Sequence, residues 1–299
     1  MTKDLTTGKI MPILVKFTIP LVLGNLFQLT YNAVDSIIVG HFVGKEALAA
    51  VGICNPITTL MILFLNGLCM GASILMGMQY GAKDYDTLHR QISTTMISGV
   101  VFSVTLTVLC VIFAVPILQL IQVDPSILDL TAEYLRIIFW GLMFTFLYNF
   151  FSSTLRALGD SNSPLYFLII SAVINAGLDV LFIVKFHMGV EGCAYATVIA
   201  QGISALLCLV YIIQKFDILK LQKTDFAPDV SMMQRLLSIG VPMGLQFSIT
   251  AIGSVILQSS VNTLGSTVVA AFTAGTKVEQ FTMAPYDALS NTSATFCGQ

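Results

Sequence analysis

Two aspartates stand inside long apolar stretches of the sequence, where ionisable side chains are costly. Asp35 lies about six residues before the polar end of one stretch, and Asp179 lies about six residues before the polar end of another. Thr197 lies about six residues into the next stretch. With a helical rise of about 1.5 Å per residue, these side chains lie at a common depth of roughly 9 Å. We expect them to form one site.

Asn175 precedes Asp179 by one helical turn, so both side chains face the same way. Carboxylate, amide and hydroxyl oxygens are hard ligands that suit Na⁺, and a pair of close carboxylates can instead carry a proton. The sequence does not distinguish Na⁺ from H⁺ as the bound ion. The alternative is that these groups only link helices inside a membrane. That alternative suits amides better than two carboxylates, because a buried charge costs more.

Neutral polar residues follow one face of two other apolar stretches. Asn25, Gln28 and Asn32 lead up to Asp35 at spacings of three, four and three, and Gln246 and Thr250 begin a second stripe with Ser254 and Gln258. A helix that faced only lipid would not carry such a stripe. We expect both stripes to line a substrate cavity.

No transition metal or organic cofactor is expected. His41, His89 and His187 fall at the ends of apolar stretches, with no cysteine or carboxylate at ligand spacing. The six cysteines form no C-x-x-C pair and are interpreted as small hydrophobic residues.

The composition is that of an integral membrane protein. Only 10% of the 299 residues are charged and 56% are hydrophobic, against about 25% charged in a typical soluble protein. The mean hydropathy is +0.87. The net charge of −2 and the absence of a basic block exclude a nucleic-acid-binding surface as the main function.

The apolar stretches are long enough to cross a bilayer as helices, each needing about 20 residues. We predict an all-α membrane protein with eight spans. Their expected cores are Phe17–Gly40, Cys54–Met78, Ile92–Val123, Leu135–Leu155, Pro164–Val184, Gly192–Gln214, Leu236–Val261 and Val268–Cys297.

Basic residues set the expected orientation. With a cytoplasmic N-terminus, the outer loops receive only Lys45 and Lys185. The cytoplasmic side receives Lys3, Lys9, Lys16, Lys83, Arg90, Arg156, Lys215, Lys220, Lys223 and Arg235. We therefore expect a multi-pass protein of the cell membrane with its N-terminus inside.

A polar connection divides the chain. Residues 1–215 are predicted to form a six-helix lobe, 216–235 a cytoplasmic linker, and 236–299 the first two helices of a second lobe. Pro20 and Pro242 occupy matching places in the two parts, which favours a parallel internal repeat. Such a repeat would need four more helices, so the sequence is interpreted as a fragment. Pairs of glycines four residues apart, Gly67 with Gly71 and Gly240 with Gly244, predict close helix packing.

Motifs for enzyme chemistry are missing. The sequence contains no G-x-x-x-x-G-K-[ST], H-E-x-x-H or G-x-S-x-G pattern. We expect a transporter and not an enzyme.

Several motifs together resemble one transporter family. These are "IPLVLGNLFQLTYNAVDSIIVGHFVGKEALAAVG", "MGMQYGAKD", "LRALGDSNSP" and "NAGLDVLFI", in this order. They resemble the first lobe of the multidrug and toxic compound extrusion (MATE) transporters, and the resemblance extends from Thr6 to Gln299. It implies twelve helices in two six-helix lobes that form a V, and export of cationic or amphipathic organic compounds driven by Na⁺ or H⁺.

The resemblance also implies roles for individual residues. The cation site of one branch of the family falls on Asp35, Asn175, Asp179 and Thr197. Tyr134 and Asn149 match positions near that site. Another branch carries a cation-binding glutamate eight residues after a proline, and this chain has Thr250 there.

These arguments favour a monomeric secondary antiporter for organic cations or amphipathic drugs, embedded in the lipid bilayer and coupled to H⁺ or Na⁺. The alternative is a flippase for a lipid-linked precursor within the same superfamily. A flippase cavity would be rich in arginine and lysine, whereas the expected membrane region offers only Arg136 and Lys277. A channel or a non-transporting receptor would instead show uncoupled flux or none.

Overall fold

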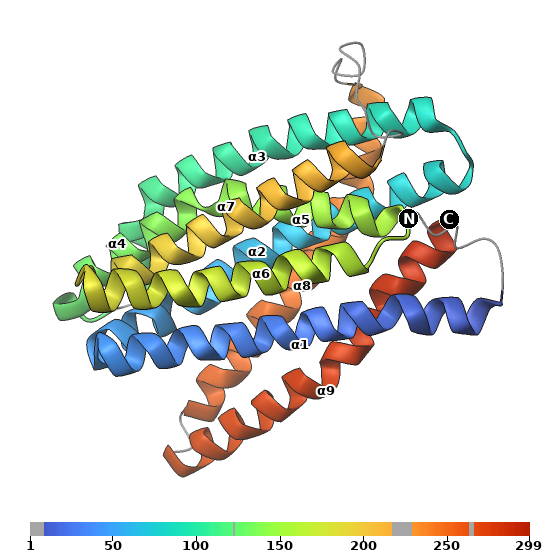
Figure 1. The fold of residues 1–299 in the computed structure, drawn as a ribbon. Coiled ribbons are helices and arrows are strands. Elements are labelled where there is room, and N and C mark those ends of the chain that lie inside the picture. Colours follow the sequence, from blue (N-terminus) through green and yellow to red (C-terminus); the bar gives the residue numbers. More distant parts are fainter. Residues whose placement is uncertain (1–8, 122, 217–228, 263–265) are drawn as a thin grey trace.

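The computed structural model of the chain describes residues 9–121, 123–216, 229–262 and 266–299, and all regular elements among them are helices. They are α1 Ile10–Phe42, α2 Lys45–Gly81, α3 Tyr85–Leu120, α4 Pro125–Trp140, α5 Leu142–Ala157, α6 Asn162–Val180, the π-helical turn η1 Leu181–Lys185, α7 Gly189–Lys215, α8 Val230–Asn262 and α9 Ser266–Gly298. Figure 1 shows them as long, roughly aligned rods, with α8 and α9 crossing the others.

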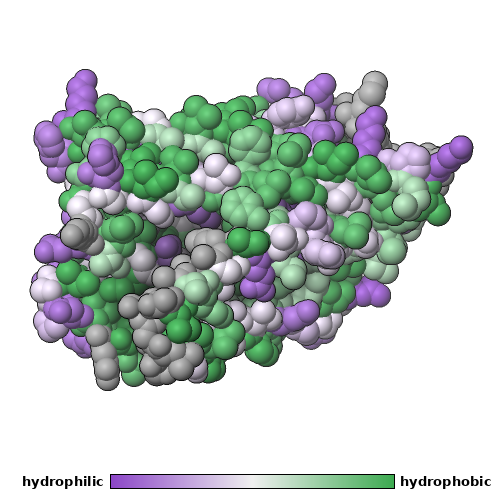
Figure 2. All heavy atoms as spheres, turned by 90° about the horizontal axis from the view of Figure 1, so that it is seen from below, coloured by the Kyte–Doolittle hydropathy of each residue, from purple (hydrophilic) through white to green (hydrophobic). Residues whose placement is uncertain are grey.

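Seven segments in the described part of the chain are long and apolar enough to cross a membrane. They correspond to the first seven predicted spans, and α4 and α5 together form one of them. α9 covers the eighth predicted segment as a helix of 33 residues but is not among the seven. Large apolar side chains point outward, for example Leu120 and Val173, which are 83% and 68% exposed. On the face in Figure 2 such side chains dominate between two ends where hydrophilic residues gather, as expected of a protein in a bilayer.

Aspartates begin several of the helices. The Asp84 carboxylate accepts a hydrogen bond from the backbone N–H of Thr87 at 3.1 Å, and Asp124 accepts one from Ser126 at 2.8 Å. Such N-caps satisfy backbone donors that have no partner within the helix. The hydrogen bonds from Thr87 and Ser126 also lower the pKa of the two aspartates below their ordinary value.

The fourth predicted span starts too late at Leu135. The Asp124 cap and Pro125, a residue favoured in the first helical turn, start α4 ten residues earlier. The helix then breaks at Gly141 before α5 continues. α8 begins at Val230, inside the predicted linker 216–235. Residues 217–228 of the predicted linker lie outside the described residues.

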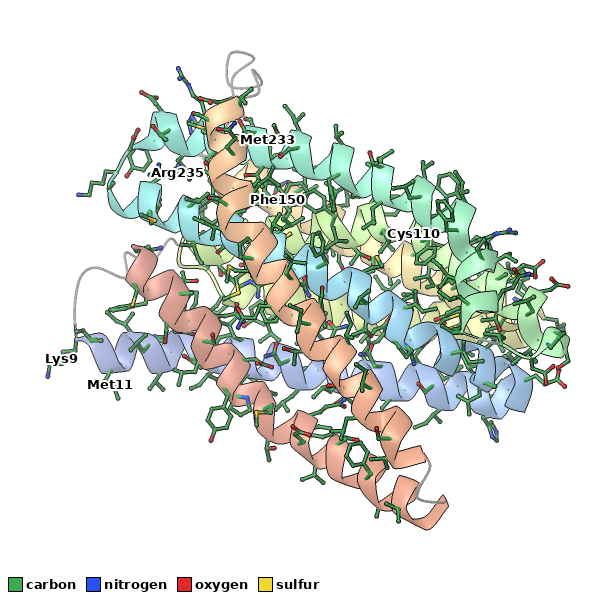
Figure 3. All side chains as sticks on the ribbon, turned by 180° about the vertical axis from the view of Figure 1, so that it is seen from behind. Lys9, Met11, Cys110, Phe150, Met233 and Arg235 are labelled. Carbon is green, nitrogen blue, oxygen red and sulfur yellow. The ribbon has the colours of Figure 1, made fainter. Side chains whose placement is uncertain are left out.

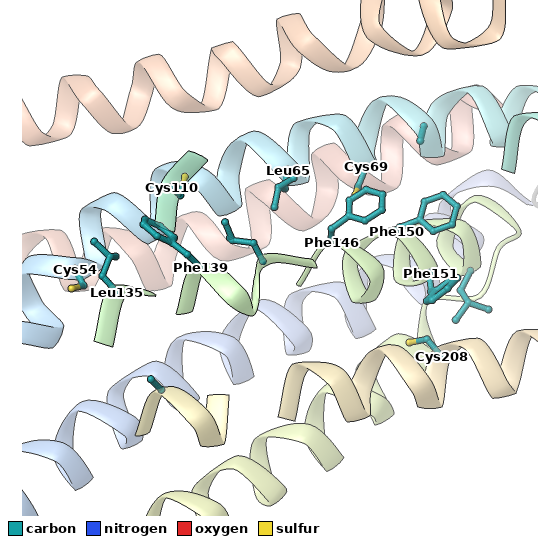
Figure 4. Close-up of a cluster of buried hydrophobic side chains, with 14 of the residues drawn as sticks. Cys54, Leu65, Cys69, Cys110, Leu135, Phe139, Phe146, Phe150, Phe151 and Cys208 are labelled. Atoms are coloured by element: carbon teal, nitrogen blue, oxygen red, sulfur yellow. The ribbon is translucent and has the colours of Figure 1, made fainter. Parts of the chain in front are cut away.

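The core lies among α2, α3, α4, α5 and α7. Phe139, Phe146 and Phe150 are buried in one cluster with Leu65 of α2, and Figure 4 shows Phe146 nearest to Leu65, with Phe139 and Phe150 on either side of it. The rings of Phe146 and Phe150 stack with centroids 5.9 Å apart. This core packs α2, α3, α4, α5 and α7 together.

The last two helices, α8 and α9, cross the first two helices in reverse order, the first of one pair against the second of the other. α8 packs along α2, and α9 packs across α1, as Figures 1 and 3 show. The predicted glycine pairs make the first crossing possible, because a β-carbon on Gly67 or Gly71 would overlap the backbone of Gly244 or Gly240. The prediction of close packing is therefore confirmed. Away from this crossing, the end of α8 and the beginning of α9 diverge from α1 (Figure 1).

We predict that Gly67→Val separates α2 from α8 and lowers the stability of the protein. The added methyl groups have no space, and overpacking typically costs about 1–3 kcal/mol. The measurement is the midpoint of thermal unfolding in detergent. Gly52→Val on the same helix is the control, since nothing lies within 4 Å of a β-carbon there. Equal losses in both variants would show that the crossing is not responsible.

Candidate functional site

Three acidic or sulfur-containing side chains from three helices meet in one buried cluster. Asp35 comes from α1, Asp179 from the end of α6 and Cys193 from the first turns of α7. One ligand atom of each lies within 4.8 Å of the others. The structure therefore brings together the two aspartates, which are 144 positions apart in the sequence.

The connection between α6 and α7 positions two of these residues. α6 runs directly into the π-helical turn η1, Leu181–Lys185, immediately after Asp179. π-Helical turns are rare and often occur at functional sites. The chain then reverses, so α7 packs against α6. Cys193 and Thr197, one turn apart on α7, thus return beside Asn175 and Asp179.

Two hydrogen bonds link the helices at this cluster. The thiol of Cys193 donates to Oδ1 of Asp35 at 3.2 Å. One turn away, Nδ2 of Asn175 donates to Oγ1 of Thr197 at 3.4 Å. The first bond joins α1 to α7, and the second joins α6 to α7.

The carboxyl group of Asp179 has no such partner. Its side chain is 0% exposed, and neither oxygen accepts a hydrogen bond from any described residue. A buried carboxylate without a partner is strongly disfavoured. A proton or a cation on Asp179 would remove this cost.

Two tyrosines complete the surroundings. Tyr134 of α4 is 6% exposed and interacts electrostatically with Cys193 and Asp35. Tyr31, one turn before Asp35 on α1, interacts with both carboxyl groups and with the side chain of Thr197. Their hydroxyl groups can donate to the carboxyl groups or accept from a hydrated ion.

Sequence reasoning did not select Cys193 and Tyr31. Cys193 was interpreted only as a small hydrophobic residue, like the other cysteines. A signal was present in the spacing, because Tyr31 lies four residues before Asp35 and Cys193 four residues before Thr197. Residues at that spacing share a helix face.

The residues expected to line a substrate cavity are spread along several helices. Nδ2 of Asn25 donates to the carbonyl of Ala284 on α9 at 3.2 Å, and Nδ2 of Asn149 donates to Thr145 on its own helix at 2.8 Å. Gln28 is half-buried and Asn32 is exposed on α1; on α8, Gln246 and Thr250 are exposed. Their role in a cavity stays a prediction.

Two comparisons of the sequence agree with each other. The sequence model of the MatE family matches residues 20–181. The chain is 31% identical over 300 residues to the probable multidrug resistance protein YpnP, and 34% identical over 290 residues to the probable multidrug resistance protein YoeA, both of Bacillus subtilis strain 168. These alignments cover 99% and 95% of this chain, and 66% and 63% of the relatives. The chain thus spans a little under two thirds of each relative's length.

Solved structures show the same fold. A crystal structure of a MATE protein in the bent conformation superposes with a TM-score of 0.91 at 24% identity, covering 99% of this chain and 67% of that one. An outward-facing multidrug resistance MATE family transporter of the MOP superfamily also gives 0.91 at 24% identity, covering 99% and 66%.

The apolar helices, long enough to span a bilayer, define a multi-pass membrane protein with a polar cluster between its helices. The family match over more than half of the chain then identifies it: the chain belongs to the MatE family.

We predict that Asp179→Asn keeps or raises the thermal stability at neutral pH without added Na⁺, because it removes a buried ionisable group that has no partner. Asp160→Asn is the matched comparison. Asp160 is also buried, but its carboxylate accepts from the backbone of Asn162 and Ser163 at 3.1 Å each and from Tyr211 at 3.2 Å.

Replacing Asp160 should cost about 1 kcal/mol through lost hydrogen bonds. Both variants are compared with the wild type by thermal unfolding in detergent. If Asp179→Asn lowered the unfolding midpoint as much as Asp160→Asn does, the carboxyl group of Asp179 would be stabilising the helix packing.

Proposed function

We propose that the protein exports cationic or amphipathic organic compounds across the cell membrane in exchange for H⁺ or Na⁺. The observation that carries this proposal is the unpartnered, fully buried carboxyl group of Asp179 beside Asp35. The names of the relatives support the direction of transport, since YpnP and YoeA are described as multidrug resistance proteins. The staphylococcal relative MepA is described as a multidrug export protein.

The two carboxyl groups form the coupling site in this proposal. Asn175, Thr197 and Tyr134 supply further oxygen or amide contacts around them. A proton or Na⁺ between Asp35 and Asp179 neutralises like charges and allows α1 to pack against α6 and α7. Without the ion the charges repel each other and attract water, so the helices separate. An ion that binds the two arrangements with different affinity drives the transition between them.

Helix α1 is suited to transmit this change. Pro20 lies inside it, and a proline removes one backbone hydrogen bond and permits a kink. α1 contacts α6 on one side and α9 on another. Asn25 lies five residues after Pro20, and its side chain donates a hydrogen bond to the carbonyl of Ala284 on α9. A rearrangement around Asp35 therefore reaches the region where the second lobe begins.

The contacts of α1 with α9 and of α2 with α8 support a two-lobe architecture. If α8 and α9 are the second copies of α1 and α2, the contact of α1 with α9 and the contact of α2 with α8 are equivalent. A twofold relation between the lobes requires this reciprocity. We propose a first lobe at 1–215 and a second lobe that begins with α8 at Val230, joined through 216–229, within a monomer of twelve helices. Gln246, Thr250, Asn25, Gln28, Asn32 and Asn149 then face the substrate path between the lobes.

The proposed orientation places the N-terminus in the cytoplasm. Lys9 and Arg235 lie towards the same end of the structure (Figure 3). Basic residues gather on the cytoplasmic side of membrane proteins. The flippase alternative is less favoured, because the buried cluster is acidic and Arg136 is exposed.

We predict that Asp35→Asn and Asp179→Asn each lower ion-driven efflux at least about tenfold, a typical size for coupling between two sites. The complete reading frame that encodes this chain is expressed in cells, and efflux of ethidium is followed from everted vesicles with imposed Na⁺ or H⁺ gradients. The gradient that drives efflux identifies the ion. Asp129→Asn, an exposed aspartate on α4, is the control and keeps wild-type efflux.

Expression and size-exclusion profiles are compared for all variants. Efflux that persists in both site variants would reduce the aspartates to a structural role. Efflux of no organic cation under either gradient would contradict the antiporter.

A further inference from the structure

We propose that Asp35, Asp179 and Cys193 form a binding site for a thiophilic divalent cation of the class of Zn²⁺ and Cd²⁺, in which Cys193 determines the selectivity for such ions. The inference deepens the proposed function, because it concerns the same pocket. The binding itself does not depend on transport, and only its effect on efflux rests on the proposed function.

The cluster has the dimensions of a metal site. Zinc binds sulfur at about 2.3 Å and carboxylate oxygen at about 2.0–2.2 Å, so two ligand atoms of a tetrahedral site lie roughly 3.5 Å apart. Sγ of Cys193 and Oδ1 of Asp35 are already 3.2 Å apart. The three ligand atoms lie within 4.8 Å of one another, so a contraction of roughly 1 Å closes the site around an ion.

An independent observation points to a ligand. Asp179 is completely buried, and both of its oxygens lack a partner among the described residues, although they lie next to the thiol and the other carboxyl group. A metal ion would satisfy these oxygens. The hydrogen bond from Cys193 to Asp35 engages Asp35 and leaves Asp179 free to be the first ligand.

The thiol changes which cations the site prefers. Oxygen-only sites suit hard ions such as Na⁺, whereas thiolate ligands select softer ions such as Zn²⁺. The thiol loses its proton to water when it becomes a ligand. Two carboxylates and one thiolate then supply three negative charges around a divalent ion. No other cysteine among the described residues lies in a group of metal-binding donors of this kind.

A fourth ligand is available nearby. Thr197 lies one turn after Cys193 on α7, and its hydroxyl accepts from Asn175 on α6. Either this hydroxyl or a water molecule held by it can complete a tetrahedral site. The site thus combines donors from α1, α6 and α7, and an ion bound there holds the three helices together.

Because the ion uses both proposed coupling carboxylates, it competes with H⁺ or Na⁺. We expect Cd²⁺ to inhibit efflux and to raise the midpoint of thermal unfolding. The second effect follows from preferential binding to the folded state.

The first experiment measures Cd²⁺ binding to the purified protein by isothermal calorimetry and by the ultraviolet charge-transfer absorption of a cadmium–thiolate bond. The wild type should bind one Cd²⁺ and show this absorption. Absence of the absorption at saturating Cd²⁺ would overturn the assignment of Cys193 as a ligand, independently of any variant.

The second experiment compares Cys193→Ser with Cys208→Ser. Both cysteines are buried on α7, and a separation of 15 residues places them about 22 Å apart along the helix. Cys193→Ser should weaken Cd²⁺ binding at least about tenfold, as losses around metal sites commonly do. Cys208→Ser should bind like the wild type.

Efflux measurements distinguish a failure of this metal site from a failure of the proposed antiporter. Efflux by Cys193→Ser, measured relative to the same variant without Cd²⁺, should be insensitive to Cd²⁺, whereas efflux by Cys208→Ser should stay sensitive. Unchanged Cd²⁺ affinity in Cys193→Ser, or an equal loss in Cys208→Ser, would refute the site whether or not the protein transports. Cd²⁺ binding with the expected cysteine dependence but no efflux would uphold the site and count against the antiporter.

Discussion

The interior between α1, α6 and α7 has a low dielectric constant, and it contains a carboxyl group that receives no hydrogen bond from a neighbouring described side chain. Asp179 is buried without a partner, and Asp35 stands within reach with its own potential charge. Such an arrangement costs free energy unless a proton or a cation is present. The closed packing of these three helices is therefore favoured by a bound proton or cation, and in the proposed antiporter this dependence lets an ion gradient act on the structure.

The rest of the molecule divides into a rigid and a movable part around this cluster. The aromatic core of α4 and α5 holds α2, α3 and α7 together. α1 contributes Val39 to that core, contains Pro20 and contacts both α6 and α9. The glycine crossing of α2 and α8 brings two backbones into close contact and fixes the second pair of helices to the first. A change at Asp35 thus acts on a helix that contains a proline and contacts both α6 and α9.

Cys193 gives the cluster a chemistry that its oxygens alone do not have. The buried cysteines among the described residues, Cys193 included, belong to the hydrophobic core, where a thiol commonly behaves as a small apolar group. Cys193 also donates to a carboxylate. The two buried cysteines of α7 therefore differ: Cys208 lies among apolar groups, and Cys193 is a polar neighbour of the two aspartates.

The sequence by itself determined the membrane class, the helices and the two aspartates, because length, hydropathy and the cost of an ionisable group in a bilayer are local properties that can be read along the chain. Equal depth also indicated that Asp35, Asp179 and Thr197 could meet. Depth does not determine which way a helix is rotated or which helices are neighbours. Only the tertiary structure decided that Cys193 and Tyr31 face the aspartates, that Asp179 lacks a partner and that α8 crosses α2. These features depend on side-chain packing between segments far apart in the sequence, which no local pattern specifies.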